Sequence, residues 1–392
     1  MTGITQMSFE WHEAILTLLS LSTCLFLVFL GPKVPYLYGA TAHLRAVQAA
    51  HSRQTPRVGG IAIFGSMALS TLFAPSEVAR SYGLFVAATS IVFIVGLAED
   101  LGFGVSPVKR LCAVCLASLA ACLFLGVWLP RLDIPILDNM MSYAVIGVPI
   151  TLLVTAGVAN GFNLIDGVNG LASLAAIVAV VTLGLIAEQA EYTVMVQLAT
   201  LFAAGLVGFF AMNYPYGFIF LGDAGAYTIG FVLSWFGIAI LLNAPEASAW
   251  AILLTMFWPL ADTLLAMYRR ARRNTPKMAP DRLHVHQLVM RALEIYVLGR
   301  GSRNLANPLS TLVLAPFVIA PPITGVLLWD NPTLAFWAVL CFLGLFFGTY
   351  AIAFQVLGLL KRKGGLKRVA QEVSLSPIPV TSPVSDQYPE QL

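Results

Sequence analysis

The sequence predicts an all-α polytopic membrane protein. Its 392 residues are 58% hydrophobic and only 10% charged, and the mean hydropathy is +0.83. A soluble protein of this length needs more charged side chains to cover its surface than this chain has. In addition, apolar runs of roughly 17–22 residues recur along the chain, which suits helices that cross a hydrocarbon core about 30 Å thick.

About eleven such runs are predicted to be transmembrane helices. They lie at 14–30, 58–74, 82–98, 110–129, 142–159, 170–187, 193–212, 225–242, 248–267, 309–328 and 332–359. Gly, Pro and Ser occur within several of them, as is usual where membrane helices pack closely. The first run has acidic residues and no Lys or Arg before it, so we expect a retained helix and not a cleaved signal peptide.

The distribution of basic residues predicts the orientation of these helices. Twenty of the 22 Lys and Arg residues fall in the loops after the first, third and ninth runs and in the C-terminal segment. The other two, Arg80 and Arg131, fall in loops on the opposite side. Because basic residues are concentrated on the cytoplasmic side of membrane proteins, the N-terminus is predicted outside and the C-terminus in the cytoplasm.

The chain is predicted to form one polytopic domain over residues 14–360, with a cytoplasmic loop at 268–303. Four arginines just after the ninth run, at 269, 270, 272 and 273, are expected to anchor it against anionic lipid. Residues 369–392 are rich in Pro, Ser and Val, and we expect them to form a disordered cytoplasmic tail.

Polar side chains gather in the segment NGFNLIDGVNG, residues 160–170, which lies between two apolar runs. Asn160, Asn163, Asp166 and Asn169 recur there at every third position. On the predicted topology these residues share the cytoplasmic side with Glu99, Asp100, Asp223, Asp262 and the segment 282–286. Ionisable residues at membrane depth are costly and usually functional, so the five separated clusters predict one site on this face.

These carboxylate and amide oxygens would repel one another without a bound cation. Mg²⁺ prefers oxygen ligands and usually takes one or two carboxylates together with substrate phosphates. Asp223, between two glycines at the start of an apolar run, is the first candidate ligand, followed by Asn163 and Asp166. The alternative is that Asp223 and Asn169 are only helix N-caps, a position that Asp and Asn favour.

Basic side chains near these clusters suit a phosphate-containing ligand. Arg282, His284 and His286 form a donor-rich patch, and Arg57 precedes the glycine pair at 59–60, which lets a backbone approach a ligand closely. Lys109 and its neighbour Arg110 are either membrane anchors or phosphate partners. Zinc at the two histidines is a rival interpretation, but no cysteine or third nearby histidine completes such a site. The residue types together indicate transfer of a phosphoryl-linked group to a lipid.

Five motifs resemble one enzyme family in their order and spacing. They are TPRVGGIAIFG at 55–65, VGLAEDLG at 95–102, NGFNLIDGVNGLASL at 160–174, FLGDAGAYTIGF at 220–231 and DRLHVHQL at 281–288. Over roughly residues 14–360 the chain is similar to the polyprenyl-phosphate N-acetylhexosamine-1-phosphate transferases (glycosyltransferase family 4), and in particular to the undecaprenyl-phosphate GlcNAc-1-phosphate transferases.

The resemblance implies a Mg²⁺-dependent membrane enzyme, with Mn²⁺ as a substitute metal, in the bacterial inner membrane. Undecaprenyl phosphate would react with a UDP-N-acetylhexosamine at the cytoplasmic face and release UMP, which starts a lipid-linked surface polysaccharide such as the O-antigen of lipopolysaccharide. Asp223, Asn163 and Asp166 match the metal and nucleotide residues of the family, and Asp100 matches an acidic residue assigned to the metal or to the acceptor phosphate. The other site residues expected to bind substrate are Arg57, Glu99, Lys109, Asn160, Asn169, Arg282, His284 and His286.

Three positions depart from the family pattern. Glu99 replaces the first Asp of the usual Asp-Asp pair, Asn169 replaces a common Asp, and Gln287 replaces the last His of the usual His-x-His-His motif. These departures favour a polysaccharide enzyme over the related phospho-MurNAc-pentapeptide transferase of peptidoglycan synthesis. They also fit an inactive relative.

A transporter of lipid-linked sugars is the alternative from a different functional class. Transporters place ionisable residues near the bilayer midplane, whereas this chain is predicted to gather them on one side. The small net charge of +3 gives no indication of nucleic-acid binding. A homodimer is compatible with the sequence, although no motif defines an interface.

Overall fold

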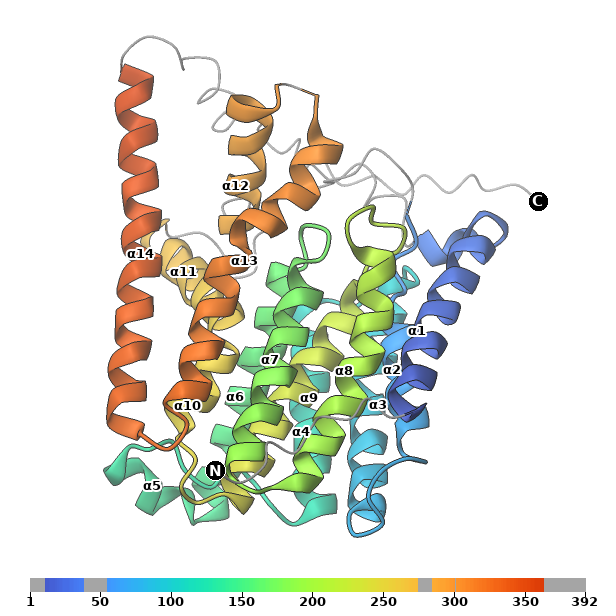
Figure 1. Cartoon of the computed structure of the whole chain (residues 1–392), viewed down its shortest axis with the longest axis vertical. Coiled ribbons are helices and arrows are strands. Elements are labelled where there is room, and N and C mark those ends of the chain that lie inside the picture. The colour runs from blue at the N-terminus through green and yellow to red at the C-terminus, as the bar shows by residue number, and fades with distance from the viewer. Residues whose placement is uncertain (1–10, 39–54, 274–283, 300, 363–392) are drawn as a thin grey trace, which may run out of the picture. The chain divides into compact units, whose positions relative to one another are not determined.

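The computed structural model describes residues 11–38, 55–273, 284–299 and 301–362, and in the last helix it describes side chains only as far as residue 352. Every regular element in these ranges is a helix (Figure 1). The chain divides into two compact units, Met1–Leu343 and Gly344–Leu392. The predicted tail at 369–392 and Arg282 lie outside the described residues.

The helices follow the predicted apolar runs in order. They are α1 (Trp11–Leu30), the short η1 (Gly31–Lys33) and η2 (Pro35–Tyr38), α2 (Gly60–Ser70), α3 (Ala79–Asp100), α4 (Pro107–Leu125), α5 (Pro135–Met141), α6 (Ala144–Ile165), α7 (Leu171–Gln189), α8 (Thr193–Asn213), α9 (Gly222–Asn243), α10 (Ala249–Thr255), α11 (Phe257–Arg273), α12 (Val285–Ala292), η4 (Leu293–Val297), α13 (Arg303–Leu327) and α14 (Pro332–Arg362). The boundary between the two units falls within α14.

Nine of these helices are long and apolar enough to cross a membrane, or ten if one bent pair is counted as a single span, within the ranges that the structure describes. The predicted number of eleven is therefore not confirmed. The run 58–74 contains only the 11-residue helix α2, which at 1.5 Å per residue is shorter than the hydrocarbon core. The run 248–267 is broken at Met256 into α10 and α11, which meet at 84°.

Helix α9 forms the centre of the first unit. It contacts α2, α3, α4, α6, α7 and α8. Of its 18 most apolar consecutive residues, 89% are buried. Small residues allow this close packing, because a Cβ atom at Gly96 of α3 would clash with the backbone of Ala224, and one at Gly230 would clash with the backbone of Ala159 on α6. In a membrane, such backbone approach takes the place of the hydrophobic effect in holding helices together.

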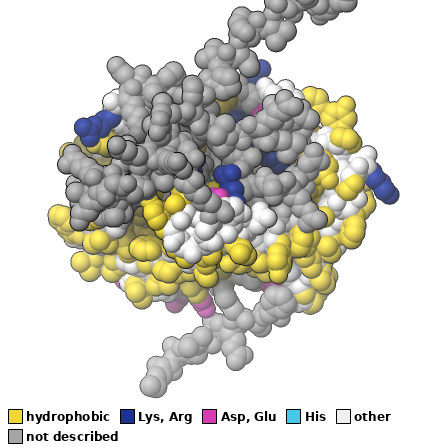
Figure 2. All heavy atoms as spheres, turned by 90° about the horizontal axis from the view of Figure 1, so that it is seen from above, with side chains coloured by type: hydrophobic (Ala, Val, Ile, Leu, Met, Phe, Trp, Pro, Cys, Tyr) yellow, Lys and Arg dark blue, Asp and Glu magenta, His cyan; other side chains and the backbone are white. Residues whose placement is uncertain are grey.

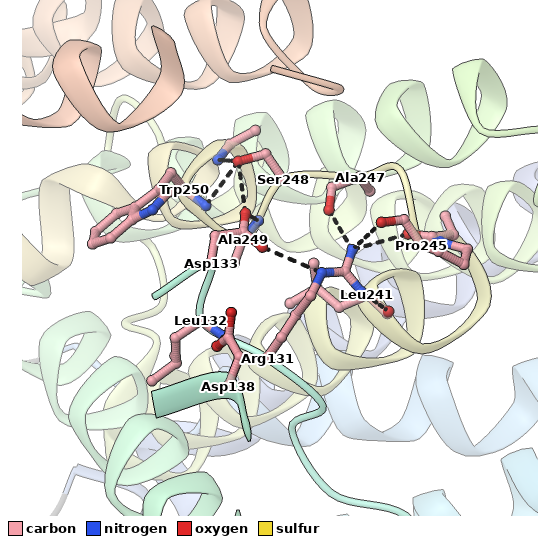
Figure 3. Close-up of polar contacts among 12 residues, drawn as sticks. Arg131, Leu132, Asp133, Asp138, Leu241, Pro245, Ala247, Ser248, Ala249 and Trp250 are labelled. Atoms are coloured by element: carbon pink, nitrogen blue, oxygen red, sulfur yellow. Dashed lines mark hydrogen bonds and ion pairs between the residues drawn. The ribbon is translucent and has the colours of Figure 1, made fainter. Parts of the chain in front are cut away.

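The end of α9 farther from α12 is held by Arg131 in the segment between α4 and α5 (Figure 3). Its guanidinium donates hydrogen bonds to the carbonyl oxygens of Leu241 at 2.7 Å, Ala244 at 3.2 Å, Pro245 at 2.9 Å and Ala247 at 2.5 Å. These carbonyls lie in the last turn of α9 and just after it, where helical carbonyls lack partners within the helix. Arg131 therefore serves as a C-terminal cap for the central helix.

Asp133 extends this arrangement to the start of α10. Its carboxylate accepts hydrogen bonds from the Ser248 hydroxyl at 3.1 Å and the Ala249 N–H at 2.6 Å, and it forms an ion pair with Arg131 at 3.2 Å. Figure 3 shows both side chains directed toward the connection between α9 and α10. The acidic residue at a helix N-terminus and the basic residue at a helix C-terminus both match the helix dipoles.

The segment 268–303, predicted as a loop, is partly helical. Helix α11 continues to Arg273, so the four arginines belong to its last turns and do not follow the helix. Residues 285–297 form α12 and the π-helix η4, and α13 begins at Arg303, six residues before its predicted start. Arg269 is buried, with only 7% of its surface exposed. A side chain that anchors a helix against lipid headgroups does not need to be buried to this extent.

Candidate active site

The site is organised around Asp223, in the first turn of α9. Gly222 adopts a positive φ of 72°, and a Cβ atom there would clash with the Arg57 carbonyl and the Asp100 carboxylate. Glycine is therefore needed for the chain to turn into α9 at this point. The N-cap of α9 is Leu221 and makes no side-chain cap, so the alternative interpretation of Asp223 as a simple N-cap is wrong.

Asp100, the last residue of α3, holds the start of α9. Its two carboxylate oxygens accept the N–H groups of Asp223 and Ala224, each at 2.8 Å, and the side chain is buried. A carboxylate at a helix N-terminus satisfies free amides and matches the helix dipole. The preceding Glu99 instead accepts the N–H of Val105 at 2.5 Å and so supports the turn after α3.

Two further side chains contact the carboxylate of Asp223. Asn163 of α6 donates its Nδ2 to Oδ1 at 2.8 Å, and the guanidinium of Arg110, at the start of α4, forms an ion pair with Oδ2. Arg110 also lies over the ring of Tyr227, one turn further along α9. Lys109, which was expected to bind substrate, is exposed. Its neighbour Arg110, for which the sequence left a membrane-anchoring and a phosphate-binding role open, is the one that contacts Asp223.

Asp166 follows the last residue of α6 and lies on the same side of the site. Burial raises the pKa of its carboxyl to about 6, while the charge of Arg57 and a hydrogen bond from the Gly222 backbone act to lower that pKa. These interactions place Asp166 beside the segment that carries Arg57 and beside the entry to α9. Asn160 lies one turn before Asn163 on α6 and is partly buried.

The two histidines approach the site from α12. His284 Nδ1 lies 2.6 Å from Oδ2 of Asp262 on α11. His286 is 1% exposed, and a Cβ atom at Gly167 would clash with its Nε2, so its ring packs directly on the loop after α6. Burial lowers the pKa of His286 to about 4, with a smaller contribution from the charge of His284, whereas Asp262 acts to raise it. His286 is therefore neutral at pH 7.

Asn169 has a different role from the cap that the sequence suggested. The N-cap of α7 is Gly170, with no side-chain cap, so that interpretation is also wrong. Asn169 is buried, and its Nδ2 donates to the carbonyl of Pro215 at 2.9 Å. An Asp at this position, as in the usual family pattern, would direct an oxygen at that carbonyl. Asn169 therefore joins the loop after α6 to the loop after α8.

The residues that meet at the start of α9 come from segments far apart in the sequence. They are Asp100, Arg110, Asn163, Asp166 and Asp223, with Arg57 beside them and His286 against the same loop. Figure 2 views the molecule from above and shows a few basic and acidic side chains near the centre of this face, with further basic side chains at its rim. The predicted convergence of the clusters is thus observed for these residues.

A protein-family model supports the resemblance seen in the sequence motifs. Residues 82–241, which include most of α3, all of α4 to α8 and most of α9, match the model described as Glycosyl transferase family 4. The chain is therefore similar to this glycosyltransferase family over the segment that carries Asp100, Arg110, Asn163, Asp166 and Asp223.

Relatives of this chain are named as transferases that act on polyprenyl phosphates. The chain is 28% identical over 252 residues to the undecaprenyl-phosphate alpha-N-acetylglucosaminyl 1-phosphate transferase of Yersinia pestis, covering 62% of this chain and 67% of that enzyme. It is 24% identical over 258 residues to a probable undecaprenyl-phosphate N-acetylglucosaminyl 1-phosphate transferase of Bacillus subtilis (64% and 72% covered). It is 26% identical over 286 residues to the decaprenyl-phosphate N-acetylglucosaminephosphotransferase of Mycolicibacterium smegmatis (64% and 69% covered).

The donor groups at the site fit a hard cation such as Mg²⁺. Asp223, Asp166 and Asn163 supply only oxygen and amide groups, and hard cations prefer oxygen ligands. Within the described residues, no three His, Cys, Asp or Glu side chains are grouped so that they could hold a metal by themselves. Mg²⁺ usually takes one or two carboxylates and completes its coordination with substrate phosphates and water.

Proposed function

We propose that this protein transfers an N-acetylhexosamine-1-phosphate from a UDP-sugar to undecaprenyl phosphate and releases UMP. The observation that carries the proposal is that Asp100, Arg110 and Asn163 contact Asp223, while Asp166 interacts with the neighbouring Gly222. This arrangement combines carboxylates for a cation with guanidinium groups for phosphates, at the ends of apolar helices. The names of the relatives support the polyprenyl-phosphate acceptor and N-acetylglucosamine as the first donor to test.

The proposed reaction exchanges one phosphorus–oxygen bond for another. An oxygen of the acceptor phosphate attacks the sugar-linked phosphorus of the donor, and the bond from that phosphorus to the bridging oxygen breaks. That oxygen leaves with UMP, and the product is an undecaprenyl diphospho-sugar. The second pKa of a phosphate monoester is about 6, so the acceptor is already largely ionised at pH 7 and needs no strong general base.

The side chains of the site have different proposed roles in this reaction. Asp223, Asp166 and Asn163 would hold Mg²⁺, which when bound neutralises charge on the diphosphate. Arg110 and Arg57 carry guanidinium groups suited to phosphate oxygens. Asp100 keeps the start of α9 in place through two backbone hydrogen bonds. His284, oriented by Asp262, and His286 would contact the donor, as the family resemblance implies.

We place the reaction at the cytoplasmic face of a bacterial inner membrane. The basic-residue distribution supports this orientation, and UDP-sugars are cytoplasmic substrates. The product would then start a lipid-linked cell-surface polysaccharide, such as an O-antigen.

A donor panel tests the proposal. Purified protein in detergent is incubated with undecaprenyl phosphate, Mg²⁺ and, in separate reactions, UDP-GlcNAc, UDP-GalNAc, other UDP-N-acetylhexosamines and UDP-MurNAc-pentapeptide. We expect acceptor-dependent UMP release with an N-acetylhexosamine donor. UMP release with the pentapeptide donor alone would indicate the peptidoglycan enzyme instead. Folded protein that releases no UMP from any donor would contradict the enzymatic proposal and favour a transporter or an inactive relative.

A further inference from the structure

The loop after α6 is clamped by two side chains of α13 that lie outside the segment matched by the family model. Asn307 Oδ1 accepts the backbone N–H of Asn169 at 2.7 Å, and the Thr311 hydroxyl donates to the carbonyl of Asn169 at 2.6 Å. Asn307 and Thr311 are four residues apart and therefore share one helix face. Both are almost fully buried, at 1% and 2% exposure. One face of α13 thus holds both backbone groups of a single loop residue.

The same loop is fixed from its other side by α8. Asn213, the last residue of α8, accepts the N–H of Gly170 at 2.7 Å and donates to the carbonyl of Ile219 at 2.8 Å. The segment after Ile219 leads directly into α9, and there the Gly59 and Gly60 amides donate to the Phe220 and Leu221 carbonyls. The loop after α6, the entry to α9 and the entry to α2 are therefore connected by buried hydrogen bonds.

The clamp acts on a short stretch of chain. Only residues 166–170 separate α6 from α7, so a shift at Asn169 is passed to Asp166 within three residues and to the end of α6 that carries Asn163. His286 packs on Gly167 in the middle of this stretch, and α12 in turn contacts α13. A displacement of Asn169 would thus change the relation of Asn163 and Asp166 to both Asp223 and His286.

We propose that Asn307 and Thr311 are positioning residues for the sugar-phosphate transfer. They hold the backbone of Asn169 so that Asn163 and Asp166 stay aligned with Asp223. This inference rests on the proposed function, because it assigns the residues to the donor and metal side of that reaction. Misplacement of a catalytic group by about 1 Å can cost up to 100-fold in rate, so the loss of one clamp bond is expected to be measurable.

The test compares variants that differ by one hydroxyl group. Thr311→Val removes the donor while keeping the shape, Thr311→Ser keeps the donor, and Thr324→Val is the matched control. Thr324 lies on the same helix, but its exposed hydroxyl bonds only to the carbonyl of Ala320 within α13. KM for the UDP-sugar, KM for undecaprenyl phosphate, kcat and the thermal unfolding midpoint are measured for each variant.

We expect Thr311→Val to raise KM for the UDP-sugar or to lower kcat by about tenfold. KM for undecaprenyl phosphate should stay within about twofold of wild type, Thr311→Ser should restore the donor KM, and Thr324→Val should match wild type. If Thr311→Val does not fold, Thr311→Ala carries the same expectation. Asn307→Ala should shift the donor KM in the same direction.

Three other outcomes would overturn the positioning role. If Thr311→Val lowers the unfolding midpoint with kcat and both KM values unchanged, the clamp only stabilises the fold. If all four quantities stay at wild-type values, the hydroxyl has no role. If wild-type protein itself releases no UMP, the proposed function fails and the positioning role fails with it, an outcome distinct from the first two.

Discussion

Single side chains at the start of α9 show what residue types can and cannot predict. Asp223 was predicted as the central acidic residue, and contacts from α4 and α6 meet at its carboxylate. Arg110 was indistinguishable from Lys109, because adjacent residues at a helix start differ only in helical phase. The cap interpretation of Asn169 was wrong, and its partners Pro215, Asn307 and Thr311 could not be predicted because they are distant in sequence. Long-range hydrogen bonds of this kind leave no local pattern.

Asp223→Asn tests the central residue directly. The change keeps the size of the side chain but removes the charge that a cation and Arg110 would both use. We expect UMP release to fall below about a tenth of the wild-type rate, which corresponds to more than about 1.4 kcal/mol of transition-state stabilisation. Asp330→Asn, at an exposed position after α13, is the matched control and should keep full activity. A higher rate in Asp223→Asn would rule out a principal role in metal binding.

The buried His286 predicts a pH dependence of stability. Its pKa is about 4 in the folded protein and 6.5 in its ordinary state, so between these values the unfolded chain binds a proton that the folded protein does not. Stability is therefore fully present above pH 6.5 and is lost as the pH falls toward 4. By pH 5 the loss relative to pH 8 is about 2 kcal/mol.

Thermal unfolding of wild type and His286→Gln between pH 8 and pH 5 measures this effect. The wild-type midpoint should fall further than that of the variant, which cannot take up the proton at this position. Parallel curves for the two proteins would mean that His286 is already accessible to protons in the folded state.

For the helices, the sequence correctly predicted where along the chain they occur. It did not predict the length of α2 or the bend between α10 and α11. Each of the eleven apolar runs is helical in the structure. Hydropathy could not show that α2 stops after 11 residues or that the chain bends by 84° at Met256, because a bent or short helix is as apolar as a straight one. The central position of α9 was equally hidden, since it depends on which glycines face neighbouring helices.

Arg131→Ala tests how α9 is held at the end away from the site. The change leaves carbonyl groups at the end of α9 without their donor and leaves Asp133 without its cation. Unsatisfied groups of this kind cost about 1–3 kcal/mol each, so the thermal unfolding midpoint should fall. KM for the UDP-sugar should not change, because the donor is proposed to bind at the opposite end. Arg80→Ala, at an exposed position on α3, should leave the midpoint unchanged, and an equal fall in both variants would contradict the capping role.

At the scale of the whole molecule, the gathering of polar groups was the most successful sequence prediction. The clusters were assigned to one face because basic residues and helix lengths fixed which helix ends point the same way. The structure joins Asp100 to α9, Asn163 to Asp223 and His286 to Gly167. The pairing itself could not be predicted, because topology gives the side of the membrane on which a residue lies and not its neighbours.

Sealed vesicles test the predicted orientation. A UDP-sugar is too strongly charged to cross a bilayer, so only vesicles that expose the cytoplasmic face should consume it. We expect acceptor-dependent consumption in inside-out vesicles and little in right-side-out vesicles until detergent is added. Equal consumption in both sealed preparations, or the reverse preference, would contradict the orientation inferred from the basic residues.

The most direct measurement follows the sugar-linked phosphate of the donor. Wild-type protein is incubated with undecaprenyl phosphate, Mg²⁺ and UDP-GlcNAc that carries a radioactive label on the sugar-linked phosphate only, with Asp223→Asn in parallel. Transfer of a sugar-1-phosphate moves this phosphate to the lipid, so the label should appear in the lipid extract together with unlabelled UMP, and the variant should show neither. Label that stays with the nucleotide as UDP would mean that only the sugar moves, and it would contradict the proposed reaction.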